Sequence, residues 1–406
     1  MQSVAWAQQR HLTVGNRIEM RRRQLGLSRR TVANIVGRSD EWLRLIESGQ
    51  QRLENVYLIV RLAEVLHIGD FRQLIDIPPA PPQPRTEGAE MLIGLFAPSV
   101  IGYPARVDPA ATVSIPQLRE QLQTCQRIWA SSPTRYSELG QRLPPVLAMT
   151  RMLLWRDYSD GVGDLALTAA QLARQVLTRL GAHTLALTVA DRSMEIAGRL
   201  DRPGSIAAAA EQYADALLHL EQFTLCREHA ETAAAELSPT IPDTADEAVL
   251  WGALQLTAAK SAVCQHNVQQ ASRLMARAHE VANRLGADRS CLGITFGPSE
   301  VGIARMEVAL GENDFDEVIR TAATVEFADD HSITSQARYH IALAHAFVHK
   351  GEDVAAALAL EKAATACPED LRYDHNAHHT LQKLLRHSNG KPRRDVARLA
   401  ALAEVV

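Results

Sequence analysis

Five amphipathic segments of similar length recur in the second half of the chain, and this recurrence constrains the fold more than any other feature. They begin at His183, Phe223, Asn267, Asn313 and Asp353, so that successive starts lie 40, 44, 46 and 40 residues apart. Further amphipathic stretches precede them at 205–220, 245–263, 301–310 and 332–349. A helix pair repeated at this spacing buries its apolar face only against neighbouring pairs. The pattern therefore predicts a stacked helical array.

The clearest copy of the repeat is LAHAFVHKGEDVAAALALEKAATACP, over residues 343–368. It has small residues at Ala346, Ala357 and Ala364, a glycine at Gly351 and a closing proline at Pro368. Small side chains are needed where two helices approach closely, and glycine where a turn requires left-handed backbone. The copy resembles the tetratricopeptide repeat, although the spacing exceeds that family's usual ~34 residues. An irregular helical bundle is the alternative interpretation.

The composition also favours helices. The 406 residues are 46% apolar, 22% charged and only 5% aromatic, which suits helices packed through small side chains. Five cysteines stand far apart without a CxxC pair, so neither a disulfide framework nor a zinc site is expected. No charged start precedes an apolar stretch, and no run reaches the ~18 apolar residues of a membrane helix. We expect an all-α protein in the cytoplasm, with no membrane contact.

A run of prolines over residues 78–84, PPAPPQP, predicts a boundary between folded units, because proline cannot donate a backbone hydrogen bond and favours extended geometry. Residues 1–77 are expected to form one domain, with helices at about 13–25, 29–36, 40–48, 55–66 and 70–75. We expect a proline-rich linker and irregular segment over 78–115. The repeat domain is then predicted over 116–406.

Charge is distributed unevenly between these parts. Residues 1–78 hold twelve arginines against eight acidic residues, whereas the whole chain has a net charge of −4. A basic front on an acidic body is typical of a small nucleic-acid-binding domain attached to another module.

The strongest local motif is RRRQLGLSRRTVANIVGRSDEWLRLIESGQQRLENVYLIVRLAEVLHI, over residues 21–68. Gly26 ends the first helix, Ser28 and Ser39 are helix N-caps, and Gly37 makes the tight turn between the second and third helices. Core positions are predicted at Val32, Ala33, Trp42, Leu43 and Ile46. With its IExG ending, the segment resembles the Cro/repressor-type (XRE) helix-turn-helix, which implies a five-helix, lambda-repressor-like domain.

The resemblance implies roles for individual residues. Arg22 and Glu47 would form an ion pair that holds the domain together, and the rest of the scaffold would comprise Ala33, Gly37, Trp42 and Ile46. Arg29 and Arg30, at the start of the second helix, would contact phosphate. The remaining expected DNA contacts are Ser39, Asp40, Glu41 and Arg44 on the recognition helix, Leu45 at a base-touching position, and Arg52 at the backbone.

Asp40 and Glu41 depart from the family, whose members usually carry neutral or basic residues there. Two interpretations remain open. The carboxylates could accept hydrogen bonds from cytosine N4 groups, or they could complement the positive end of the helix dipole.

Motifs for catalysis and metal binding are weak. His345 and His349 lie one helical turn apart, but no HExxH, DxD or cysteine partner accompanies them, so we expect no metal site. The sequence has neither a glycine-rich phosphate loop nor a GxSxG elbow, and no cofactor or enzymatic activity is expected. Glu300, Arg305 and Glu307 are expected to serve a solvated face or groove polarity.

These features together resemble the peptide-sensing regulators of Gram-positive bacteria and the Ala/Arg-rich XRE regulators of actinobacteria. The segments MLIGLFAPSVIG and FGPSEVGIARMEVALGENDF resemble the second group in particular. The resemblance implies a homodimeric transcriptional regulator that binds a palindromic operator in double-stranded DNA. A small molecule or peptide would bind on the concave face of the repeats, about residues 150–350. The alternatives are a protein-interaction adaptor that the helix-turn-helix only localises, and a plasmid or phage repressor without a small ligand.

Overall fold

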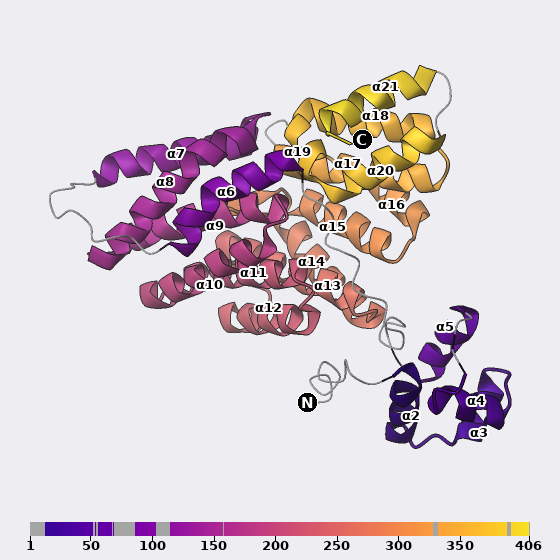
Figure 1. Ribbon diagram of the computed structural model, residues 1–406. Coiled ribbons are helices and arrows are strands. Elements are labelled where there is room, and N and C mark those ends of the chain that lie inside the picture. The colour runs from indigo at the N-terminus through magenta and orange to yellow at the C-terminus, as the bar shows by residue number, and fades with distance from the viewer. Residues whose placement is uncertain are drawn as a thin grey trace. The chain divides into compact units, whose positions relative to one another are not determined.

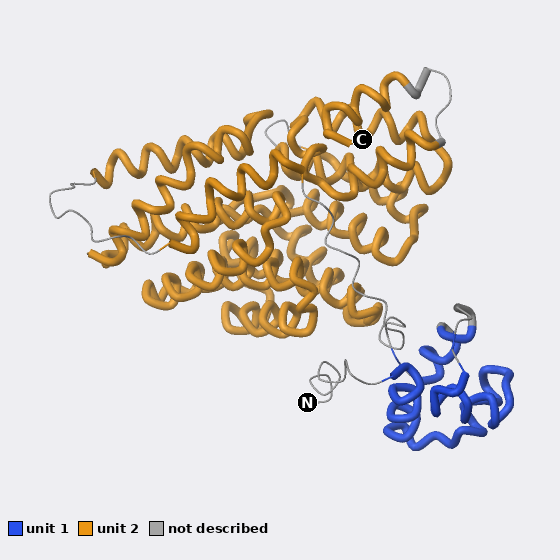
Figure 2. Tube along the Cα trace, viewed as in Figure 1, with its two compact units in different colours: residues 1–84 blue, residues 85–406 orange. Residues whose placement is uncertain are grey.

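The computed structural model describes residues 13–51, 53, 56–66, 68, 86–102, 114–156, 158–327, 332–387 and 391–405. The chain divides into two compact units, Met1–Pro84 and Arg85–Val406 (Figure 2). The division falls at the end of the proline run. The two units are described separately below as unit 1 and unit 2.

Unit 1 is a small helical domain. Its described helices are α2 Val14–Gln24, α3 Arg29–Ile35, α4 Asp40–Glu47 and α5 Val56–Val65, which confirms four of the five predicted helices. The fifth, predicted over 70–75, lies outside the described residues. The core contains Ile18, Val32, Ala33, Leu43 and Leu62, each fully buried. Residues from all four helices thus meet in one core.

Unit 2 is an array of helical hairpins (Figure 1). The hairpins are α9 Asp160–Arg179 with α10 His183–Leu200, α11 Pro203–His219 with α12 Phe223–Leu237, α13 Ala245–Cys264 with α14 Val268–Leu285, α15 Pro298–Gly311 with α16 Phe315–Ala322, and α17 Ile333–His349 with α18 Asp353–Ala366. The first helix of each hairpin packs on the first helix of the next. The predicted helix pairs and their stacking are confirmed.

Every hairpin makes the same turn. The middle residue of each turn has a positive φ: Gly181 (74°), Glu221 (58°), His266 (55°), Asn313 (59°) and Gly351 (77°). Only two of the five are glycine, the residue that adopts this conformation without steric cost. Repetition of the turn at non-glycine positions shows that the packing of the two helices imposes it. The turn predicted at Gly351 is confirmed.

In the described part of unit 2, three helices precede the hairpins and three follow them. They are α6 Glu87–Ile101, α7 Ile115–Ser131 and α8 Arg135–Arg156, and α19 Pro368–Tyr373, α20 His375–His387 and α21 Lys391–Leu402. Among the described residues, no helix is both long enough and apolar enough to cross a membrane.

The expectation of an irregular segment over 78–115 is wrong for residues 87–101, which form α6. Thr86 caps this helix, because its hydroxyl accepts a hydrogen bond from the backbone N–H of Ala89 (3.2 Å). Ala89, Leu92, Phe96 and Val100 recur at helical spacing and are buried. Pro98 lies in the last turn of the helix, where its missing N–H removes one bond of the hydrogen-bond ladder, and the helix ends three residues later.

The described residues of unit 2 include one short β-hairpin within the predicted all-α fold. Strands β1 Arg289–Cys291 and β2 Ile294–Phe296 pair antiparallel around a two-residue turn. Both turn residues, Leu292 and Gly293, have positive φ, as a tight hairpin requires. The side-chain amide of Gln175 in α9 donates to the Gly293 carbonyl (3.4 Å). The hairpin therefore reaches from the third and fourth helix pairs back to the first.

A buried ion pair joins the beginning of α8 to α19. Arg135 is fully buried and donates from Nη2 to both carboxylate oxygens of Asp370, at 2.6 and 2.7 Å. The Tyr136 hydroxyl donates to the same carboxylate (2.6 Å), and the backbone N–H of Tyr136 donates to Glu369 (2.7 Å). The Arg135 guanidinium also lies 4.2 Å from the centre of the Trp129 ring. Residues 235 positions apart are thus held together in the interior of unit 2.

Candidate nucleic-acid interface

The segment α3–turn–α4 is defined by two matching caps and one glycine. Ser28 Oγ accepts from the Thr31 backbone N–H (3.0 Å), and Ser39 Oγ accepts from the Trp42 backbone N–H (3.1 Å). Gly37, between the helices, has φ +71°. The predicted caps and turn are confirmed.

A buried carboxylate fixes the end of α4. Glu47 accepts from Arg22 Nε (2.6 Å) and Arg22 Nη2 (3.0 Å), and its side chain is only 2% exposed. Arg22 also donates from Nη1 to the Leu27 carbonyl in the turn after α2 (2.9 Å). The predicted pair of Arg22 and Glu47 is present, and it connects α2, the following turn and α4.

Arg29 belongs to the same cluster, which sequence reasoning missed. Its Nε donates to Glu47 Oε2 (2.6 Å), and this hydrogen bond raises the pKa of the Arg29 guanidinium. The phosphate contact of Arg29 stays a prediction, and its ion pair with Glu47 would compete with that contact. The sequence analysis assigned the Glu47 carboxylate to Arg22 alone. In the structure this carboxylate accepts hydrogen bonds from both Arg22 and Arg29.

Sequence reasoning also missed Gly15, where α2 crosses α4. A Cβ added at Gly15 would lie 2.1 Å from the Ile46 carbonyl oxygen and 2.6 Å from that of Glu47. Backbone atoms leave no room for a side chain here. The signal in the sequence was a glycine inside a helix. Because glycine lowers helix stability, its presence there often indicates that another backbone passes close by.

The leading end of α4 is open to solvent. Ser39, Asp40 and Glu41 are exposed, whereas Leu43 and Ile46 on the opposite face are buried. Leu45 is half-buried. Trp42 is also half-buried and packs on the edge of the core, so its predicted core position is only partly correct.

Charges on this end are partly compensated within the helix. Arg44 donates to Glu41 from Nη2 (2.6 Å) and Nε (2.8 Å), and these hydrogen bonds lower the pKa of Glu41. The two side chains are 43% and 63% exposed, so the pair is weak and can exchange for another partner at little cost. Asp40 lies in the first turn of α4, where a carboxylate complements the helix dipole.

Two arginines flank this end without an ion pair among the described residues. They are Arg30 in the first turn of α3 and Arg38 immediately before the Ser39 cap, and both are exposed. Arg38 was absent from the predicted site, although its place before a cap already indicated a solvent-facing cation. Arg52, a predicted contact, lies outside the described residues.

In unit 2, a polar ladder follows the first helices of the five hairpins, and each rung joins one helix to the next. The rungs are Arg174–Asp215 (2.5 Å), Thr257–Glu211 (3.1 Å), Lys260–Glu307 (2.7 Å) and Arg338–Glu307 (2.7 Å). Side chains of the ion-paired members are between 7% and 28% exposed. Water therefore reaches the ladder, although most of each side chain is covered.

The pKa values of two carboxyls in the polar ladder are shifted in opposite directions. Burial disfavours the charged form of Glu307, but Arg338 and Lys260 outweigh it and lower the pKa to about 2. Burial and the neighbouring Asp215 raise the pKa of Glu211, which has no ion pair among the described residues. Glu211 is thus the carboxyl that a cationic ligand group could engage.

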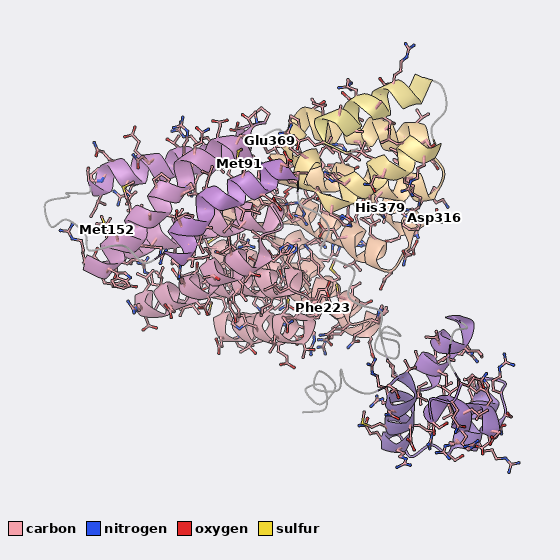
Figure 3. All side chains as sticks on the ribbon, viewed as in Figure 1. Met91, Met152, Phe223, Asp316, Glu369 and His379 are labelled. Carbon is pink, nitrogen blue, oxygen red and sulfur yellow. The ribbon has the colours of Figure 1, made fainter. Side chains whose placement is uncertain are left out.

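Three histidine rings gather between α17 and α20. The ring centre of His345 lies 4.5 Å from that of His349 and 5.5 Å from that of His379 (labelled in Figure 3). Burial and the adjacent histidines lower the pKa of His345 to about 4. Within the described part of the chain, no three His, Cys, Asp or Glu side chains are arranged to hold a metal ion.

Comparison with known proteins gives few matches. No protein-family model and no curated protein matches the sequence. Among solved structures, the chain is similar to the crystal structure of Bacillus thuringiensis PlcR in complex with the peptide PapR7 and DNA, at 11% identity and a TM-score of 0.35. The match covers 77% of this chain and 94% of that chain. A similarity at this level supports no inference, so the proposals below depend on the contacts within this chain.

Proposed function

We propose that the chain is a transcriptional regulator in which unit 1 binds duplex DNA by inserting the leading end of α4 into the major groove. The observation that carries the proposal is the combination of an exposed leading end with a rigid base. Ser39, Asp40 and Glu41 face solvent, while Glu47 at the other end of the helix is held by Arg22 and buried. A helix presented in this way has the geometry of a recognition helix.

Charge supports the same proposal. Arg30 lies in the first turn of α3 and Arg38 in the turn before α4, and both are exposed and available to phosphate oxygens. On approach to DNA, Arg44 can leave its exposed pair with Glu41 and contact a phosphate or a base edge. Glu41 would then be free to accept from a cytosine amino group, one of the two roles that the sequence leaves open.

We further propose that unit 2 binds a small-molecule or peptide signal along the polar ladder, and that two copies of the chain bind a palindromic operator as a homodimer. The ladder offers paired charges that water reaches and one carboxyl, Glu211, without an ion pair in the described chain. A ligand with a cationic amine would pair with it. The proposal includes no catalytic step and no cofactor.

The experiment is selection of genomic fragments by the full-length protein, followed by a salt titration of the selected sites. The logarithm of the association constant should fall linearly with the logarithm of salt concentration. Arg38→Ala and Arg30→Ala should each weaken binding to all fragments and reduce that slope by about 1. Light scattering and footprinting on the selected site would test the homodimer and the symmetry of the operator.

Arg61→Ala is the matched control, because Arg61 is a partly exposed arginine on α5 that pairs with Glu64 (2.8 Å). Its variant should bind DNA as the parent protein does. Retention of no fragment at low salt would contradict the proposal. Equal losses in the Arg38 and Arg61 variants would contradict the assignment of the DNA-facing side.

A further inference from the structure

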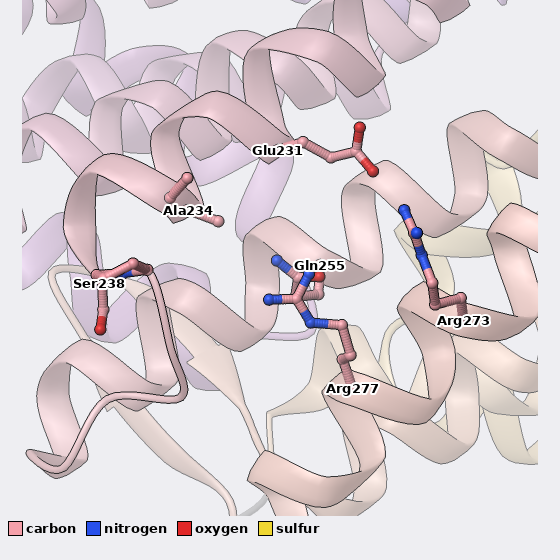
Figure 4. Close-up of a pocket in the computed structure, with 8 residues that line it drawn as sticks. Glu231, Ala234, Ser238, Gln255, Arg273 and Arg277 are labelled. Carbon is pink, nitrogen blue, oxygen red and sulfur yellow. The ribbon is translucent and has the colours of Figure 1, made fainter.

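A pocket of about 220 Å³ lies between α12, α13 and α14, and none of its lining residues belongs to the polar ladder (Figure 4). Glu231 approaches from α12, Gln255 from α13, and Arg273 and Arg277 from α14. Arg273 and Arg277 are four residues apart and so share one face of their helix. Neither the sequence nor the proposed function assigns a role to this pocket.

The first observation is a buried amide without a partner. Gln255 is 1% exposed, and its side-chain oxygen has no hydrogen-bond partner among the described residues. An unsatisfied polar atom in the interior is unfavourable unless water or a ligand satisfies it. Gln255 lines the pocket, so a bound molecule could provide the missing hydrogen bond.

The second observation is an excess of positive charge. Arg273 and Arg277 make no ion pair among the described residues, whereas Glu231 already accepts from Arg227 (2.9 Å) and from the Gln270 amide. Glu231 and Arg273 point toward one another from opposite helices in Figure 4, but no ion pair joins them. Since Arg227 balances the one carboxylate, two guanidinium groups are left for an anion.

The third observation is that the Arg277 guanidinium is held in place by a neighbouring aromatic ring before any ligand binds. The Arg277 guanidinium carbon lies 4.7 Å from the centre of the Trp251 ring. Trp251 is itself fully buried, and its indole N–H donates to the Ser238 carbonyl (3.2 Å). Stacking on a fixed ring restrains the guanidinium plane, while its N–H edge remains able to bind an oxyanion in the bidentate mode.

Size restricts the ligand. At about 220 Å³ the pocket is smaller than the ~300–1,000 Å³ clefts that hold drug-sized ligands, which suits a small metabolite. We propose that the α12–α14 pocket binds a small organic anion. The carboxylate or phosphate of that anion contacts Arg273 and Arg277, and a further polar group pairs with the Gln255 amide. The site lies in unit 2 and is independent of DNA binding.

The test is isothermal titration of the full-length protein, without DNA, with succinate, glycerol 1-phosphate and inorganic phosphate, and with glycerol as the uncharged probe. We expect saturable binding of glycerol 1-phosphate, whose hydroxyl groups can donate to the Gln255 side-chain oxygen, weaker binding of succinate, which offers no donor, and no binding of glycerol. Because charge-assisted hydrogen bonds are lost, Arg273→Gln should weaken binding about tenfold to a hundredfold. Arg273 is exposed, so its replacement leaves the fold intact.

Arg284→Gln is the matched control on the same helix, because Arg284 is 56% exposed and pairs with Glu280. Its affinity for the anion should equal that of the parent protein. If no probe binds, or if sodium chloride at equal ionic strength removes the heat, the pocket is not an anion site. Equal affinities in the Arg273 and Arg284 variants would also overturn the proposal. Because DNA is absent, failure here is separate from failure of the proposed function.

Discussion

The ion cluster at Glu47 gives the sharpest test of what holds the recognition helix in place. Glu47→Gln keeps the shape of the side chain but removes its charge, and it places an NH2 group next to the donors of Arg22 and Arg29. Both side chains of the Arg22–Glu47 pair are nearly inaccessible, at 8% and 2% exposed. Breaking a buried pair by changing one partner costs about 3–5 kcal/mol. A domain the size of unit 1 has only about 3–10 kcal/mol of stability in total.

Hydrogen exchange of the full-length protein measures this loss locally, since peptides from residues 13–51 report on unit 1 alone. In Glu47→Gln, amides of α2 and α4 should lose most of their protection, while those of unit 2 should be unchanged. Glu41→Gln is the control: it also removes a carboxylate that pairs with an arginine in α4, but that pair is exposed and contributes little to stability. Equal protection in the two variants would refute the argument that burial makes the Glu47 pair essential.

Three further predictions follow from the structure. Gly15→Ala should unfold unit 1, because the new methyl group meets the backbone of α4. Gly94 lies in α6, and a Cβ added there would meet no atom within 4 Å, so Gly94→Ala should stabilise unit 2 by up to about 1 kcal/mol. Thermal unfolding checks both variants. An unchanged stability of unit 1 in Gly15→Ala would disprove the close crossing of α2 and α4. Asp370→Asn should lower the stability of unit 2 by about 3–5 kcal/mol in urea unfolding, and replacing its buried arginine partner by methionine as well should restore much of it; no loss in the single variant would argue against the buried pair. The stability of unit 2 should fall in two acid steps. A buried neutral His345 has a pKa of about 4, so stability is lost as pH falls from about 6.5 to 4. Glu307 has a lowered pKa of about 2, so stability present above about pH 4.5 is lost as pH falls toward 2. His345→Gln and Glu307→Gln should each flatten their own step, and an unchanged pH profile in either would contradict the assignment.

Local signals allowed the sequence to predict much of unit 1. A serine cap forms its hydrogen bond three residues away, so Ser28 and Ser39 could be assigned from spacing alone. Gly37 marked a backbone conformation that other residues rarely adopt. The Arg22–Glu47 pair came from the family resemblance. Its third member, Arg29, was missed because the number of donors a carboxylate binds depends on three-dimensional packing.

The features missed in unit 2 depend on contacts distant in sequence. The run around Pro98 was interpreted as irregular because proline usually ends a helix, yet packing of the apolar face of α6 outweighs that cost. Nothing in the sequence near Arg135 indicated its partner at Asp370, 235 residues away. The pocket between α12 and α14 likewise depends on two guanidinium groups that have no ion pair among the described residues, which only the folded structure shows.

The bond between Arg135 and Asp370 changes how such an array folds. In an open stack each pair contacts only its neighbours, so the ends can fray one at a time and stability adds up locally. Here α19, which follows the last hairpin, is joined to α8, which precedes the first, and neither can detach without exposing a charge that is otherwise buried. Unit 2 should therefore melt in one cooperative step, and its assembly should wait for a slow, late encounter between segments 235 residues apart.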